Sequence, residues 1–127
     1  MTCDAWQVVV VPFPFTDRAT IKRRPALVLS GKPFNRHGHS VLAMITSASH
    51  HPWPGDTPIG NLAPAGLTAR SLVRLKVFTL DNRFIARRIG TLEDADRRAV
   101  AAHAREFISA FAGPPTLKTG RADSDER

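Results

Sequence analysis

Short apolar runs separated by turn residues fill the chain as far as Gly90. The run Val8–Val11 is β-branched throughout and predicts a buried strand, which ends near Pro14 because proline cannot donate to a sheet ladder. Strands separated by turn signals about every eight to twelve residues favour a small barrel or a curled sheet. The other predicted strands are Ala26–Ser30, Val41–Thr46, Ser71–Thr79 and Phe84–Ile89, and a short strand could lie around Ile59–Leu62.

From residue 92 the apolar residues recur at three- and four-residue spacing, which predicts an amphipathic helix over residues 92–111. Thr91 is expected to be its N-cap, with Asp94 at the capping-box position, and Gly113 and the prolines after it would end the helix. The chain is therefore predicted to be an α+β protein, mostly β, with a C-terminal helix. Residues 1–113 form one predicted domain, and the polar, patternless residues 114–127 form a predicted disordered tail.

A chain of 127 residues is expected to form a single domain with a sizeable core. Its one cysteine, Cys3, excludes an intrachain disulfide and suits a reducing compartment. The N-terminus lacks the basic and apolar regions of a signal peptide, and no stretch approaches the length of a membrane span. We therefore expect a cytoplasmic protein that has no membrane partner.

The formal net charge of +7 is unevenly distributed along the chain. Residues 1–92 carry twelve Lys or Arg and four Asp or Glu, a net of +8, whereas residues 93–113 carry three and four, and residues 114–127 carry three and three. The positive field therefore belongs to the predicted β portion. A basic face of this kind favours a polyanionic partner, with solubility alone as the alternative.

The segment Lys22–Ser30 places three cations directly before Pro25 and an apolar strand. The ring of Pro25 fixes its own φ and biases Arg24 toward an extended conformation. The Arg24 side chain therefore projects from a conformationally restricted strand start. The next predicted strand ends in Thr46 and Ser47. If the two strands pair as antiparallel neighbours, Arg24 and Thr46 lie at the same end of the sheet. A guanidinium and a hydroxyl there are suited to binding phosphate; the alternatives are a surface ion pair and a strand-end turn.

Several segments, in the correct order, resemble the MazF/PemK-like toxin family. They are Val8–Asp17, Lys22–Ser30, Met44–Ser47, Gly66-Leu67, Ser71–Arg74, Phe78–Asp81 and Arg88–Gly90. The resemblance covers roughly residues 6–111. It implies an SH3-like small barrel with a terminal helix, usually found as a homodimer.

The resemblance also implies an activity, because the family cleaves single-stranded RNA, often mRNA at short preferred sequences. Its proposed catalytic residues are the arginine before proline and the threonine of the Ile-Thr pair, here Arg24 and Thr46. The implied reaction is attack of a 2′-hydroxyl on the adjacent phosphorus, leaving a 2′,3′-cyclic phosphate and a 5′-hydroxyl without cofactor or metal. The implied protein partner is a cognate antitoxin with an acidic, flexible segment.

Further cations and one hydroxyl are candidates for binding the RNA backbone, with a solvated basic loop as the alternative for the cations. They are Arg18, Lys22, Arg23, Ser47, Arg74 and Lys76. Arg74 matches the family's Val-Arg pair, but Lys76 stands where some members have an acidic residue, for which Asp17 or Asp81 could substitute. A second departure is Trp6-Gln7, where the family commonly has Gly-Asp.

The loop after the Ile-Thr pair holds residues with two interpretations each. Trp53 could stack a nucleobase or anchor the loop on the barrel. His50 and His51 could act as acid or base near neutral pH, or be solvated. His37 and His39 lack the Cys or carboxylate companions of a zinc site, so no metal is predicted.

Two other functions stay open at this point. The gyrase-directed CcdB toxins share the implied fold, so fold alone does not decide the target. A nucleic-acid-binding module without turnover is the third interpretation. The Arg-Pro and Ile-Thr pairs favour RNA cleavage, because a toxin that only binds a protein has no need of them.

Overall fold

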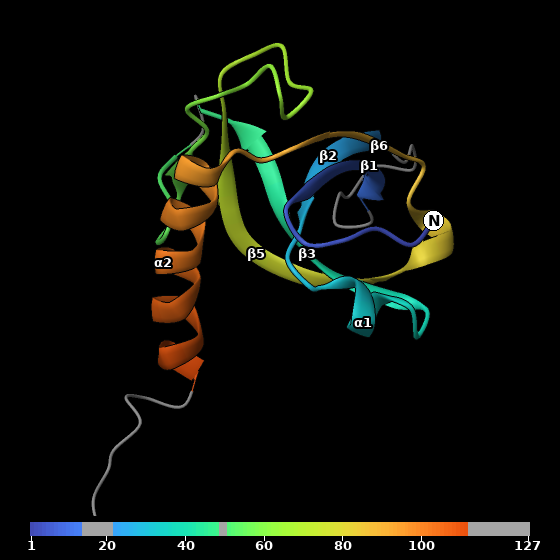
Figure 1. The fold of residues 1–127 in the computed structure, drawn as a ribbon. Coiled ribbons are helices and arrows are strands. Elements are labelled where there is room, and N and C mark those ends of the chain that lie inside the picture. Colours follow the sequence, from blue (N-terminus) through green and yellow to red (C-terminus); the bar gives the residue numbers. More distant parts are fainter. Residues whose placement is uncertain (14–21, 49–50, 112–127) are drawn as a thin grey trace, which may run out of the picture.

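The strands of the protein form one antiparallel sheet that curls into a half-barrel, with a long helix at one side (Figure 1). The computed structural model describes residues 1–13, 22–48 and 51–111. Within these residues the sheet order is β4-β5-β3-β2-β1-β6. The strands are β1 Gln7–Phe13, β2 Lys22–Val28, β3 His39–Ser47, β4 Thr57–Pro58, β5 Ser71–Asp81 and β6 Arg87–Thr91. The mostly-β fold with a C-terminal helix is as predicted.

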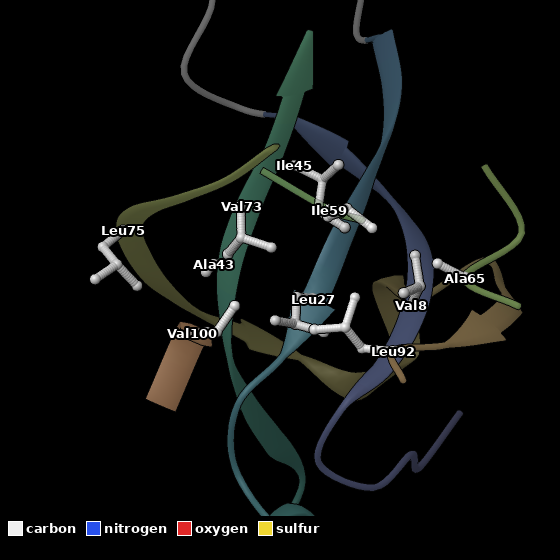
Figure 2. Close-up of a cluster of buried hydrophobic side chains, with 10 residues drawn as sticks. All are labelled: Val8, Leu27, Ala43, Ile45, Ile59, Ala65, Val73, Leu75, Leu92 and Val100. Carbon is white, nitrogen blue, oxygen red and sulfur yellow. The ribbon is translucent and has the colours of Figure 1, made fainter. Parts of the chain in front are cut away.

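Both faces of the sheet are apolar, and each face packs into its own cluster. The first cluster, shown in Figure 2, joins Val8, Leu27, Ala43, Ile45, Ile59, Ala65, Val73, Leu75, Leu92 and Val100. The second joins Cys3, Val9, Val11, Phe13, Ala26, Val28, Leu42 and Ile85. Neighbouring residues of one strand, such as Val8 and Val9, fall into different clusters because successive side chains point to opposite faces.

An irregularity in β5 bends the sheet. Ala43 pairs with Val77, but the next residue of β3, Met44, pairs with Arg74, so β5 carries the unpaired Leu75 and Lys76 between them. Such a bulge increases local twist and re-aims the side chains it contains. In this protein it places Leu75 in the first cluster and leaves Lys76 exposed.

Two short helical segments and one long helix complete the fold: α1 Lys32–Asn35, η1 Asn82–Phe84 and α2 Asp94–Phe111. The predicted N-cap was wrong, because Thr91 belongs to β6 and the helix starts at Asp94. The buried Asp96 instead accepts hydrogen bonds from the N–H groups of Gly60 and Asn61, at 2.9 and 3.1 Å. This carboxylate ties the first turn of α2 to the loop after β4.

Several strand boundaries differ from the predictions because pairing extends strands past their apolar residues. Lys22–Arg24, which precede the predicted strand Ala26–Ser30, pair with β1 as the first residues of β2. The short strand expected around Ile59–Leu62 lies at β4 instead. The last predicted strand, Phe84–Ile89, is divided between η1 and β6.

A search of the helices in the described part of the chain finds none with the length and hydropathy needed to cross a membrane.

Candidate active site and nucleic-acid interface

The β2–β3 hairpin positions the two residues that the sequence singles out. These strands are antiparallel neighbours, which confirms the predicted pairing. Their register runs from Val28 opposite Leu42 to Ala26 opposite Met44. The pairing stops one residue before Pro25, and the missing N–H of that proline accounts for the stop.

Extension of this register by two residues puts Arg24 opposite Thr46. On the other side of β2, the pairing with β1 continues from Pro25 opposite Val10 to Lys22 opposite Phe13. β2 therefore stays fixed to β1 where its ladder with β3 has ended. Alternation along a strand places Arg24 and Thr46 on the same face of the sheet as Ala26 and Met44.

Arg24 is half-buried, and its guanidinium group lies over an aromatic ring. The guanidinium carbon lies 5.9 Å from the ring centroid of Phe13, which is itself only 3% exposed. Arg24 forms no ion pair with any residue in the described ranges. Thr46 is half-buried and Ser47 exposed at the end of β3. Within the described residues, therefore, no carboxylate pairs with the guanidinium of Arg24.

A shallow groove of about 440 Å³ borders the start of β2. Arg23, Arg24 and Pro25 line it on one side, and the 66–68 loop and Arg87 of β6 line the other. Arg87 is a basic residue that sequence reasoning did not select. The only signal for it was the Arg87-Arg88 pair inside the predicted strand Phe84–Ile89. That pattern gave no indication that β6 would pair with β1 and bring Arg87 opposite Val10.

The loop that forms this groove approaches β6 very closely. Gly66 has φ of +76°, and a Cβ there would lie 2.0 Å from the carbonyl oxygen of Ile89. Gly90 is equally constrained, since its Cβ would lie 2.3 Å from the carbonyl carbon of Ala65. Only glycine fits at both positions, so the wall of the groove is set by backbone packing.

Arg74, one of the candidates for RNA binding, is buried and forms an ion pair. It is 8% exposed and forms a two-pronged ion pair with Asp56, with Nε–Oδ1 at 3.1 Å and Nη2–Oδ2 at 2.9 Å. Its Nη2 also donates to the carbonyl oxygen of His51 at 2.6 Å. Arg74 lies opposite Met44, two residues from the partner of Thr46, and so leaves the same face of the sheet.

Asp56, which the sequence did not single out, is a carboxylate partner of Arg74. Burial acts to raise the pKa of Asp56, but hydrogen bonds from Arg74 and the Trp53 N–H, with the charge of Arg74, hold that pKa below its ordinary value. The same hydrogen bond raises the pKa of Arg74. Asp81 pairs with Arg83 at the other end of β5, and Asp17 lies outside the described residues.

The remaining candidates for RNA binding fall into two groups. Lys22, Arg23, Ser47 and Lys76 are exposed, the first three of them close to the Arg24 end of the hairpin. Lys76 lies in the β5 bulge, where its Nζ is 4.4 Å from the ring centroid of Trp53. Arg18 and His50 lie outside the described residues. No cluster of three His, Cys, Asp or Glu suited to a metal ion occurs in the part of the chain that the structure describes.

Solved structures of MazF toxins share this fold. A MazF from Deinococcus radiodurans matches with a TM-score of 0.67 and 22% identity over 86% of this chain and 98% of that one. The Mycobacterium tuberculosis toxin MazF-mt6 matches with a TM-score of 0.66 and 21% identity over 81% and 96%. A mycobacterial endoribonuclease in complex with its cognate antitoxin gives 0.66 and 16% over 91% and 99%.

The sequence profile of the family described as PemK-like, MazF-like toxin of type II toxin-antitoxin system matches residues 4–108. The chain therefore belongs to this toxin family. A search of curated protein sequences finds no significant match.

Proposed function

We propose that the protein is an endoribonuclease toxin that cleaves single-stranded RNA without a metal ion. The observation that supports the proposal is the register of the β2–β3 hairpin. Continued two residues past its last pair, Ala26 opposite Met44, this register sets Arg24 opposite Thr46. The exposed cations Lys22 and Arg23 continue from the same strand. They supply the electrostatic attraction that a polyanionic substrate requires.

The proposed reaction is an internal transesterification. The 2′-oxygen forms a bond to the adjacent phosphorus, the bond from phosphorus to the 5′-oxygen breaks, and the 2′-proton leaves to a base while the 5′-oxygen gains a proton. Arg24 stabilises the negative charge that develops on the phosphorus oxygens, because a guanidinium stays protonated and offers paired donors. Thr46 donates a hydrogen bond to a non-bridging oxygen or contacts the 2′-hydroxyl.

A cognate antitoxin is the second proposed ligand of the basic face. A Deinococcus radiodurans MazF crystallised with MazE matches this chain with a TM-score of 0.66. Residues 1–92 of this chain carry a net charge of +8. An acidic, flexible segment would be attracted to the same cations as RNA and would block access to Arg24.

The third part of the proposal is a homodimer formed through α2. A groove of about 800 Å³ runs between this helix and the sheet, lined mainly by apolar residues such as Trp6, Leu29, Val77 and Phe107. The last turns of α2 extend beyond the sheet (Figure 1), and Ile108 there is 61% exposed. Each of two copies could place the exposed face of its α2 against the groove of the other copy. The same surface would then be used on both subunits, as a two-fold interface requires.

RNA cleavage in the presence of EDTA tests the enzymatic part directly. The purified protein would be incubated with a long single-stranded RNA, alongside Arg24→Ala, Thr46→Val and the exposed control Arg36→Ala. We expect discrete fragments ending in cyclic phosphate, a loss of about a hundredfold for Thr46→Val, a larger loss for Arg24→Ala and none for the control. Intact RNA with retained binding would leave a nucleic-acid module, and neither cleavage nor binding would direct attention to gyrase.

A further inference from the structure

The Trp53 loop is held in place by hydrogen bonds of its backbone. The Asp56 N–H donates to the Trp53 carbonyl at 3.0 Å, and the residues between them are Pro54 and Gly55, the latter with φ of +82°. Proline and glycine in these two places define a type II turn. The Asp56 carboxylate also accepts the Trp53 N–H at 2.9 Å.

This turn is fastened to the sheet by the buried ion pair. The Asp56 carboxylate accepts a hydrogen bond from the backbone N–H of Trp53 and forms an ion pair with Arg74 of β5. Gly55 packs against Leu75, and Thr57 bonds His103 of α2 through Oγ1–Nδ1 at 2.6 Å. The loop therefore keeps its place through backbone and carboxylate contacts, none of which uses the indole ring of Trp53.

The Trp53 side chain is left available for another purpose. It is 42% exposed and belongs to neither core cluster. Among the described residues, the indole ring contacts the ammonium group of Lys76, which lies 4.4 Å from the ring centroid. Lys76 makes no ion pair within the same ranges. A preorganised aromatic ring beside an uncompensated cation matches what single-stranded nucleic acid binds: a base stacks on the ring and a phosphate meets the cation.

We propose that Trp53 and Lys76 form a nucleotide-binding subsite for single-stranded RNA. The base stacks on the indole, and Lys76 contacts the adjacent phosphate. Arg74 and Asp56 are positioning residues that hold the backbone from which the Trp53 ring projects. The subsite deepens the proposed ribonuclease function and rests on it, since β5 carries Lys76 and Arg74 beside the strand that presents Thr46.

Binding of a non-cleavable RNA tests the subsite without relying on turnover. The probe is a mixed-sequence 2′-O-methyl RNA, which lacks the attacking hydroxyl. The protein contains two tryptophans, so 5-fluorotryptophan labelling gives two ¹⁹F resonances, and Trp53→Phe assigns them. We expect the Trp53 resonance to shift on binding and the Kd to rise about tenfold or more in Trp53→Ala. Trp53→Phe should retain most of the affinity, and Lys76→Gln should weaken binding and reduce its salt dependence.

The Arg83–Phe84 pair supplies a matched control. Phe84 is 48% exposed and the Arg83 guanidinium carbon lies 5.1 Å from its ring centroid, at the end of β5 far from Thr46. Phe84→Ala should therefore leave RNA affinity unchanged. Equal affinity of Trp53→Ala and wild type, with wild-type RNA cleavage intact, would overturn the subsite and leave the proposed function standing. A wild type that neither binds nor cleaves RNA would overturn both.

Discussion

Arg74 shows that a cation of a basic protein can be committed to a buried ion pair. Its side chain is 10% exposed and that of Asp56 14%, and both prongs of the guanidinium are occupied by the carboxylate. A buried pair adds little net stability relative to apolar residues, but removal of one partner leaves the other charge buried and unpaired. The cost of breaking this pair should therefore be much greater than that of breaking a surface pair.

Arg74→Gln is predicted to lower the free energy of unfolding by about 2–3 kcal/mol. The change leaves the Asp56 carboxylate without its ion-pair partner and the His51 carbonyl without its hydrogen bond from Arg74. Arg83→Gln is the matched control, since Arg83 is 76% exposed and its pair with Asp81 spans 3.4 Å. That change should cost less than about 0.5 kcal/mol. Urea unfolding of both variants measures the difference, and equal values would show that burial of the Arg74 pair has no energetic consequence.

The pKa of Asp56 predicts a pH dependence. Because that pKa is lower in the folded protein than in the unfolded chain, the pair stabilises the fold fully above the unfolded value of about 3.9. The contribution is lost as pH falls through the folded pKa. We expect the stability difference between wild type and Asp56→Asn to be constant from about pH 7 to 5 and to shrink below about pH 4. A difference that shrinks already near pH 6 would contradict the assignment of this pH dependence to Asp56.

At the scale of elements, the sequence predicted the strands that have strong apolar alternation and missed what depends on distant pairing. Val8–Val11 and the Arg24-Pro25 strand start were recognisable because β-branched residues and proline act locally. Arg87 and Asp56 were not recognisable as parts of the site. Arg87 reaches it through the pairing of β6 with β1, and Asp56 through a turn that meets Arg74, and no local sequence pattern specifies either contact. The bulge that exposes Lys76 has the same origin: it is a property of the β3–β5 register.

Contact between the 60–68 loop and β6 gives a prediction at this scale. Gly66→Ala should cost about 2–4 kcal/mol, because the new Cβ both requires a positive φ and meets the Ile89 carbonyl oxygen at 2.0 Å. Gly38→Ala is the control: its φ is +112°, but no atom lies within 4 Å of the added Cβ. That variant should cost only about 1–2 kcal/mol.

Thermal unfolding and RNA cleavage would be measured for both glycine variants. Since Gly66 and Arg24 line the same groove, Gly66→Ala should also reduce cleavage at temperatures where it remains folded. If both variants lose the same stability, the close approach of the loop to β6 does not fix the groove wall.

At the scale of the whole molecule, the cations at the start of β2 lie apart from the large apolar groove, whereas Lys76 lies between Leu75 and Val77, which line that groove. The groove itself lies between α2 and the sheet. The separation of the β2 cations from the groove allows a dimer to form through α2 while these cations stay open to RNA or to an acidic antitoxin segment.

Ile108→Asp tests the proposed dimer. Because Ile108 is 61% exposed within one chain, the change should leave the fold of the subunit intact, but it would bury a charge in an apolar interface. Sedimentation equilibrium at micromolar concentration should give twice the chain mass of 13.9 kDa for the wild type and a single chain mass for the variant. Phe34→Asp is the control, since Phe34 is 51% exposed on α1, away from the groove, and should leave the dimer unchanged. A wild type that sediments as a monomer, or an Ile108→Asp protein that stays dimeric, would show that this face of α2 does not join two copies.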